Sequence, residues 1–225
     1  MAGPTAIRQN VGVSVKRNSL SLGAAVGLYG NAFGAAAVAS GFSVPQACFI
    51  SLILFSGASQ FAAVGVIGAG GNPLSAIATA ALLGTRNALY AFRMAPILQV
   101  HGLKKIFAAQ LTIDESTGMA VAQEDDKDSK TGFWWTGVAV FIFWNLFTFT
   151  GALSAEALGD PAKWGLDAIV PAAFLGLLWA QIKNKRHTQL AVVSALFALA
   201  LVHFVPAGVP IMATALLAIA RGWRE

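Results

Sequence analysis

Charged residues are scarce in this chain. Only 11% of its 225 residues are Asp, Glu, Lys or Arg, whereas 56% are hydrophobic. A soluble domain carries roughly 25% charged residues, so this chain has too few to cover a surface that faces water. The mean hydropathy is +0.67, and long apolar runs alternate with short polar ones. The sequence therefore predicts an all-α, polytopic helical membrane protein.

Cysteine and the usual catalytic motifs are also lacking. Cys48 is the single cysteine, so neither a disulfide nor a cysteine metal site can form within one chain. The chain has no phosphate-binding glycine loop followed by Lys and Ser/Thr, and no His-Glu-x-x-His. Ser59 has no evident His and Asp partners, which leaves an intramembrane hydrolase with little support. We therefore expect no enzyme, no cofactor and no metal.

The few charged residues give a net charge of +5 and a pI of about 9.7. In a soluble protein this balance would suggest nucleic acid as a partner. Here the basic residues cluster at the ends of apolar runs, as at Lys16-Arg17 and residues 183–186. At such positions they bind anionic lipid and set orientation, so membrane lipid is the expected partner and these loops are expected to be cytoplasmic.

The apolar runs divide the chain into a cytoplasmic N-terminal tail, residues 1–18, and a single transmembrane domain, residues 19–222. The segment 106–122 has about 17 residues, the lower limit for a span, so it either crosses or re-enters. The chain thus has about seven or eight membrane segments, and the polar residues 123–131 are expected to form a loop. The clearer spans are expected at residues 19–40, 46–68, 73–98, 133–153, 166–182, 189–205 and 208–220.

Small residues recur in the first span. Glycines at 23, 27, 30 and 34 are three or four residues apart, which allows close approach of a second helix. Asn31 lies among them, where it either bonds to a neighbouring helix or belongs to a site. Asn31-Ala-Phe matches Asn145-Leu-Phe in the span 133–153, and a Pro45 segment matches one at Pro171. These matches indicate an internal repeat of the kind found in many transporters.

The second span is interrupted by polar and small residues at 56–60, Ser-Gly-Ala-Ser-Gln. Two interpretations fit this pattern. The segment forms either a continuous helix with a small-residue packing seam, or a discontinuous helix whose free backbone groups bind a ligand near the membrane midplane.

The third span contains two arginines, which are costly in a bilayer. A charged side chain at the centre of a membrane helix costs roughly 2.5–3.5 kcal/mol on insertion scales. Arg93 is close enough to the helix end to reach the interface, whereas Arg86 is not. Arg86 therefore needs a counter-charge, and Asp114-Glu115 is the plausible one. The alternative is that this acidic pair faces water at a loop or helix start.

Taken together, the motifs resemble the AzlC family over residues 18–220. The resemblance rests on Gly57-Ala-Ser-Gln-Phe61, on the Pro73 span with its central arginine and Tyr90, and on Leu111-Thr112-x-Asp114-Glu115. Trp144 and Gly165-Leu-Asp-x-x-x-Pro171-Ala-x-Phe174 also match. The resemblance implies a multi-pass subunit of a secondary transporter that exports branched-chain amino acids across the bacterial inner membrane. It also implies coupling to an ion gradient and a hetero-oligomer with a small hydrophobic AzlD-like membrane subunit.

One departure from the family concerns the residues around Arg86. This chain has Gly84-Thr85-Arg86-Asn87 where the family usually has Asn-Leu-Arg-His. Because such neighbours shape a pocket, another small amino acid or an organic anion stays open as the substrate.

The expected mechanism assigns a role to each polar group. Arg86 would bind the substrate carboxylate, helped by backbone amides near Ser59-Gln60, while Asp114 or Glu115 would bind the ammonium group or carry a coupling proton. The rival hypothesis is a structural subunit in which these charges are a packing ion pair. The candidate substrate-binding residues are Asn31, Gly57, Ser59, Gln60, Arg86, Asn87, Tyr90, Asp114, Glu115 and Asn145.

Overall fold

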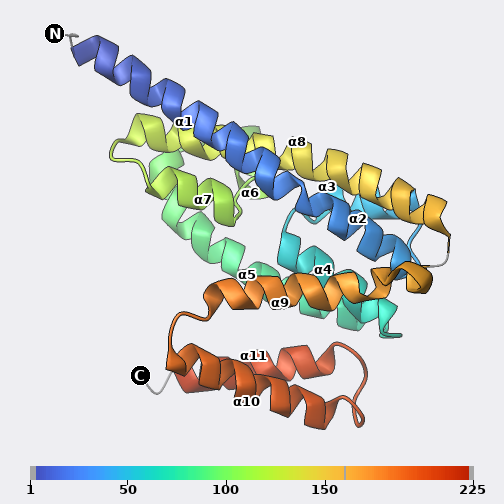
Figure 1. Cartoon of the computed structure of the whole chain (residues 1–225). Coiled ribbons are helices and arrows are strands. Elements are labelled where there is room, and N and C mark those ends of the chain that lie inside the picture. The colour runs from blue at the N-terminus through green and yellow to red at the C-terminus, as the bar shows by residue number, and fades with distance from the viewer. Residues whose placement is uncertain (1–3, 160, 223–225) are drawn as a thin grey trace.

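The computed structural model describes residues 4–159 and 161–222, and within these residues every regular element is a helix (Figure 1). This confirms the predicted all-α class. The elements are α1 (Pro4–Gly27), α2 (Tyr29–Ala39), α3 (Val44–Ile53), α4 (Gly57–Gly68), α5 (Pro73–Leu98), α6 (Leu103–Gln110), α7 (Asp114–Val121), α8 (Asp126–Leu158), the short 3-10 turns η1 (Pro161–Trp164) and η2 (Leu166–Ala168), α9 (Ile169–Gln181), α10 (Lys185–Leu201) and α11 (Val209–Gly222).

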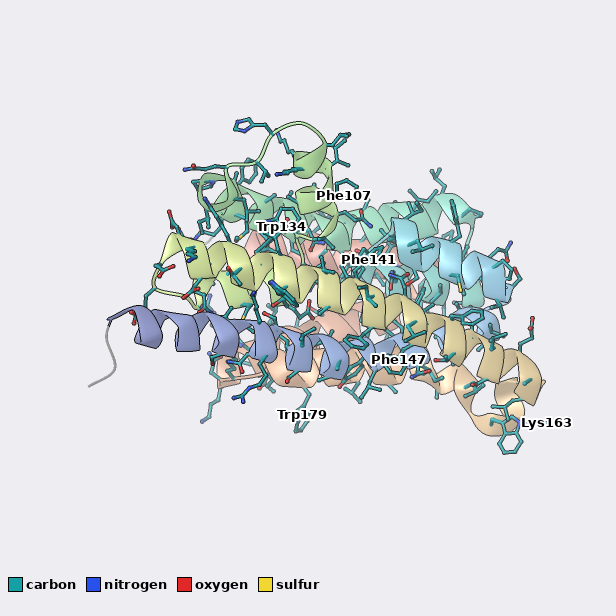
Figure 2. All side chains as sticks on the ribbon, turned by 90° about the horizontal axis from the view of Figure 1, so that it is seen from above. Phe107, Trp134, Phe141, Phe147, Lys163 and Trp179 are labelled. Atoms are coloured by element: carbon teal, nitrogen blue, oxygen red, sulfur yellow. The ribbon has the colours of Figure 1, made fainter. Side chains whose placement is uncertain are left out.

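The most extensive packing between helices joins two parallel rods, α1–α2 and α8, which lie side by side in both views and form the upper edge of the molecule in Figure 1 (Figures 1 and 2). Small residues make the close approach possible. A side chain added at Gly23 would meet Ala139, and one at Gly34 would meet the backbone of Thr148 and Ala152. The predicted glycine seam is therefore confirmed.

Polar side chains also join the two rods. Thr136 donates a hydrogen bond of 2.9 Å to Ser19, and Thr150 donates one of 2.9 Å to the Asn31 side chain. Asn31 therefore makes the interhelical bond that was one of its two predicted roles.

Among the described residues, two helices are long and apolar enough to cross a membrane by length and composition, Ser14–Ala39 and Asp126–Leu158. Helix α5 has 26 residues but carries Arg86 and Arg93. The predicted seven or eight membrane segments therefore stay a prediction. The internal repeat also stays a prediction. The spans proposed to begin its two halves, 19–40 and 133–153, correspond to the two parallel rods, which pack against each other.

Parts of the predicted loop 123–131 and of the predicted N-terminal tail 1–18 belong to helices. Helix α8 begins at Asp126, so most of the expected loop 123–131 is its first turn and a half. The Asp125 side chain caps this turn by accepting from the backbone N–H of Asp128, and acidic residues there suit the positive end of the helix dipole. Residues 4–18 of the expected tail form the start of α1, and residues 1–3 lie outside the described residues.

The breaks between helices follow the local sequence. Gly41, with φ +90°, ends the first rod, and the Ser43 side chain and Pro45 open α3. The Asn72 side chain caps α5 at Pro73, as expected from the glycine-rich turn before it. These boundaries agree with the predicted ones.

Large apolar side chains cover much of the outer surface. Phe107 is 64% exposed and Trp179 is 77% exposed, and Figure 2 shows Trp179 at the outer edge of the bundle. Helix α10 has no buried residue among those described, and it pairs with α11 as a C-terminal hairpin below α9 (Figure 1). A surface of this kind suits lipid tails and not water.

Candidate functional site

Two helix breaks meet at one cavity of about 440 Å³. The first break, residues 54–56, separates α3 from α4, and the second, residues 111–113, separates α6 from α7. Helices α1, α2, α4, α5, α7, α8 and α9 supply the remaining walls. Ligand pockets typically measure roughly 300–1,000 Å³, so the cavity is large enough for a small molecule. The polar side chains that line it are Tyr29, Ser56, Arg86, Asn87, Asp114 and Glu115.

Two glutamine amides hold the first break open. The Gln60 Nε2 group donates to the carbonyl oxygens of Ser51 and Leu54, at 3.3 and 2.6 Å. The Gln110 Nε2 group donates to those of Leu52 and Ile53, at 2.9 and 3.3 Å. The last carbonyls of α3, which a continuous helix would satisfy internally, are therefore satisfied by side chains. Of the two interpretations of residues 56–60, the discontinuous helix is correct.

The other side of this break is left uncapped. Ser56 precedes α4 with an extended backbone, and its hydroxyl donates to the Ser59 hydroxyl at 3.2 Å instead of capping a backbone N–H. Gly57 and Ala58 begin the helix and line the cavity. Free N–H groups and the helix dipole make such an end attractive to an anion.

Trp144 of α8 closes the cavity beside this helix end. Its indole N–H donates a 2.9 Å hydrogen bond to Gln60, and its ring packs against Phe33. A Cβ on Gly57 would lie 3.2 Å from the ring edge, so glycine is what lets the helix start so near the tryptophan.

The second break is fixed by short hydroxyl side chains. Ser116 donates to the carbonyl of Leu111 at 2.6 Å and accepts from the backbone N–H of Ile113 at 3.1 Å. Thr112 donates to the carbonyl of Ala108 at 2.7 Å. These bonds place the first two residues of α7, Asp114 and Glu115, at the cavity wall.

Arg86 of α5 and Asp114 of α7 form an ion pair across the cavity mouth. Arg86 Nη1 lies 2.9 Å from Asp114 Oδ2, and the two side chains are 38% and 41% exposed. The predicted counter-charge therefore pairs with Arg86, even though Asp114 also begins a helix. Tyr90, one turn along α5, has its hydroxyl within hydrogen-bonding reach of the same carboxylate. Arg93 is exposed and does not line the cavity, as its expected interfacial role requires.

Some polar atoms at the cavity are buried without a partner in the described part of the chain. These include Arg86 Nε, a donor, and Asn87 Oδ1, an acceptor. Glu115 is half-buried and forms no ion pair with any described residue. Buried polar groups are normally hydrogen-bonded, so these atoms are open to a bound ligand.

The structure divides the ten predicted site residues into two sets of five. Gly57, Arg86, Asn87, Asp114 and Glu115 line the cavity. Ser59, Gln60, Tyr90, Asn31 and Asn145 do not line it.

The residues outside the lining contact other parts of the protein and not the cavity. Ser59 and Gln60 are fully buried behind the break, so they support it and do not face a ligand. The Asn145 amide donates to the carbonyl of Phe141 within α8. The residues of this helix start that line the cavity are Gly57 and Ala58, two residues before Ser59 and Gln60.

Sequence reasoning missed two contributors to this site. Gln110 lies in the predicted segment 106–122 and was not among the candidate site residues, although it is an amide next to the second break. Helix α9 was not assigned to the site, yet Ala172, Ala173 and Gly176 line the cavity. Their small side chains carry no polar signal, so the sequence alone does not reveal this role.

Comparison with known proteins gives a consistent result. A family model described as AzlC protein matches residues 21–158. The chain is similar to the inner membrane protein YgaZ of Escherichia coli, at 32% identity over 174 residues, which cover 73% of this chain and 70% of that protein. It is also similar to an uncharacterized membrane protein of Helicobacter pylori, at 24% identity over 179 residues, covering 77% and 78%. No solved structure gives a significant match. The chain is therefore a membrane protein, and it belongs to the AzlC family.

Proposed function

We propose that this protein is a subunit of a secondary transporter that exports branched-chain or similar small amino acids across the bacterial inner membrane. The observation that carries the proposal is the Arg86–Asp114 ion pair. Both side chains line a cavity whose other walls are largely apolar. A zwitterion offers one negative and one positive group at short separation, and this pair offers the complementary charges.

The carboxylate of the substrate would bind on the Arg86 side. The ion pair uses Nη1 of Arg86, and Nε is buried without a partner. The uncapped N–H groups at Gly57 and Ala58 line the same cavity. Arginine can hold two carboxylates at once because its guanidinium carries five donors in a fixed fork.

The ammonium group would bind on the opposite side. Asp114 and Glu115 supply carboxylate oxygens there, and Asn87 supplies a buried acceptor that has no partner among the described residues. The three residues together match the three donors of an ammonium group.

The remaining wall suits an aliphatic side chain. Its apolar surface comes from the two breaks, the two rods and α4, through Val26, Phe55, Phe61, Ile113, Val140 and Trp144. Burial of a branched side chain against such a wall contributes about 1.5–3 kcal/mol.

As partner we propose a small hydrophobic AzlD-like membrane subunit, so that the working unit is a hetero-oligomer. Membership in the AzlC family supports this proposal. The extensive exposed apolar surface leaves room for such a subunit as well as for lipid.

Two other functions make different demands on the site. A carrier of small organic anions would use Arg86 and the α4 terminus but would leave Glu115 facing no cation. A structural subunit would use the ion pair for packing alone, and it would not need the partnerless polar atoms beside it.

The test is transport of labelled compounds by inverted membrane vesicles, with and without the small subunit. We expect accumulation of leucine, isoleucine and valine, and none of succinate. Succinate transport without leucine transport would replace the amino-acid proposal by the organic-anion one. No transport of either, with both subunits present in the vesicles, would favour the structural function.

A further inference from the structure

The charges that line the cavity do not balance. Among the described residues, one arginine and two carboxylates line it, which gives a net charge of −1 when all are ionised. A bound amino acid is a zwitterion and leaves this sum unchanged. An isolated charge in an apolar cavity is costly, so a further positive charge is needed there for part of the transport cycle.

Glu115 is the carboxylate that carries the excess charge. Asp114 has Arg86 at 2.9 Å, while Glu115 forms no ion pair with any described residue. The charged or titratable groups that act on it are Asp114 beside it on α7, and Arg86 and Tyr90 from α5. Tyr29 of α2 lines the cavity too, and the lining residues of α8 and α9 are uncharged.

We propose that Glu115 is the proton carrier of this transporter and that the amino acid and a proton occupy the cavity in turn. The proposal rests on the proposed transport function and adds the coupling ion and the residue that binds it. A proton on a Glu115 oxygen removes the excess negative charge and, with it, part of the attraction for an ammonium group. A substrate ammonium and this proton thus compete for the same carboxylate, which is the arrangement that antiport requires.

The cycle balances in protons and in charge. On the outer side the amino acid leaves, and an O–H bond forms on Glu115 with a proton from the medium. On the cytoplasmic side that O–H bond breaks, the proton enters the cytoplasm, and the free carboxylate receives the next amino acid. One neutral zwitterion moves out while one positive charge moves in, so the inward proton gradient drives export.

The variant Glu115→Gln keeps the shape of the side chain but cannot exchange a proton, so it holds the site in its protonated, uncoupled form. Glu156→Gln is the matched control, since Glu156 lies near the end of α8, is exposed and does not line the cavity. The probe is labelled leucine in proteoliposomes that contain the small subunit. One assay measures leucine exchange without a pH gradient, and the other measures uphill leucine movement driven by a pH gradient.

For Glu115→Gln we expect a several-fold higher KM for leucine exchange that no longer changes with pH, together with a loss of at least tenfold in gradient-driven accumulation. Glu156→Gln should match the wild type in both assays. Gradient-driven accumulation by Glu115→Gln at the wild-type level would overturn the proposal. A KM for leucine exchange that still rises on acidification in Glu115→Gln would also overturn it, because the competing proton would then bind another group.

A measurement on the wild-type protein keeps the proposal testable if the variant fails to fold. A pH-sensitive dye inside the liposomes should report proton movement opposite to leucine movement, with one proton for each leucine. Leucine exchange without any leucine-dependent proton movement would refute proton coupling and leave the transport function intact. Absence of leucine exchange by the wild type would refute the transport function instead.

Discussion

The indole nitrogen of Trp144 donates a 2.9 Å hydrogen bond to the side-chain oxygen of Gln60, and Gln60 is fully buried. The same glutamine donates through its nitrogen to the carbonyls of Ser51 and Leu54. One amide therefore ties the end of α3 to the rod α8, across the break that opens the cavity. The shape of the cavity depends on this side chain, although the side chain does not line it.

Removal of this amide should destabilise the fold. Gln60→Ala leaves the indole N–H and the Leu54 carbonyl buried without partners, and each such group costs about 1–3 kcal/mol. We expect a clear fall in the melting temperature in detergent, together with loss of transport. Gln123→Ala is the control, because Gln123 bonds only within its own turn, to Met119, and should melt near the wild type. If Gln60→Ala and Gln123→Ala had the same melting temperature, Gln60 would not stabilise the break between α3 and α4.

A methyl group at Gly57 should impair transport while the fold is kept. Its carbon would lie 3.2 Å from the Trp144 ring, which Gln60 and Phe33 hold in place. For Gly57→Ala we expect a several-fold lower rate of leucine export at unchanged expression. Gly118→Ala on α7 is the matched control, because a Cβ there meets nothing within 4 Å. A normal rate for Gly57→Ala would show that the helix start can shift without consequence.

Part of this site could be predicted from the sequence because it depends on the properties of single residues and of their neighbours in the chain. Arg86 stands in an apolar segment and needs a counter-charge, and Asp114-Glu115 was the plausible one. The start of α5 at Pro73 and the turn at Gly41 follow from residues that restrict or free the backbone.

Other features depend on contacts between distant segments, and the sequence could not supply them. Gln60 was expected to bind a ligand. The sequence shows a polar side chain at a helix break, but it does not show whether that side chain faces a cavity or the carbonyl groups that end the preceding helix. Gln110 satisfies carbonyls 57 and 58 residues away. The start of α8 was predicted to be a loop because its residues are polar and charged. Outside an apolar run, such residues occur both in loops and in the exposed first turns of helices.

The geometry of the ion pair requires arginine and not only a positive charge. Arg86→Lys keeps the charge but removes the fork that can bind Asp114 and a substrate carboxylate together. We expect at least a tenfold loss of leucine export for Arg86→Lys and complete loss for Arg86→Ala. Arg93→Lys, seven residues along the same helix and exposed, should export near the wild-type rate. If Arg93→Lys lost as much activity as Arg86→Lys, the loss would come from a general perturbation of α5 and not from the substrate site.

The seam between the two rods should tolerate no added side chain. A Cβ on Gly34 would collide with the backbone carbonyl of Thr148, which cannot move without separating the helices. Overpacking of this kind costs about 1–3 kcal/mol, so Gly34→Ala should lower the melting temperature in detergent. Gly176→Ala is the control, since a Cβ there has nothing within 4 Å. Unchanged melting of Gly34→Ala would mean that the rods lie further apart than described.

Exchange of the two charges distinguishes a transport site from a packing pair. In the double variant Arg86→Asp with Asp114→Arg, an ion pair can still form, so the fold and the assembly with the small subunit should recover relative to either single variant. Transport should not recover, because the arginine then extends from α7 and the carboxylate from α5, which reverses the charges offered to the zwitterion. Leucine export and co-purification of the two subunits are measured on the same preparations. Recovery of both would assign the pair to packing, whereas recovery of assembly alone supports its role in binding the substrate.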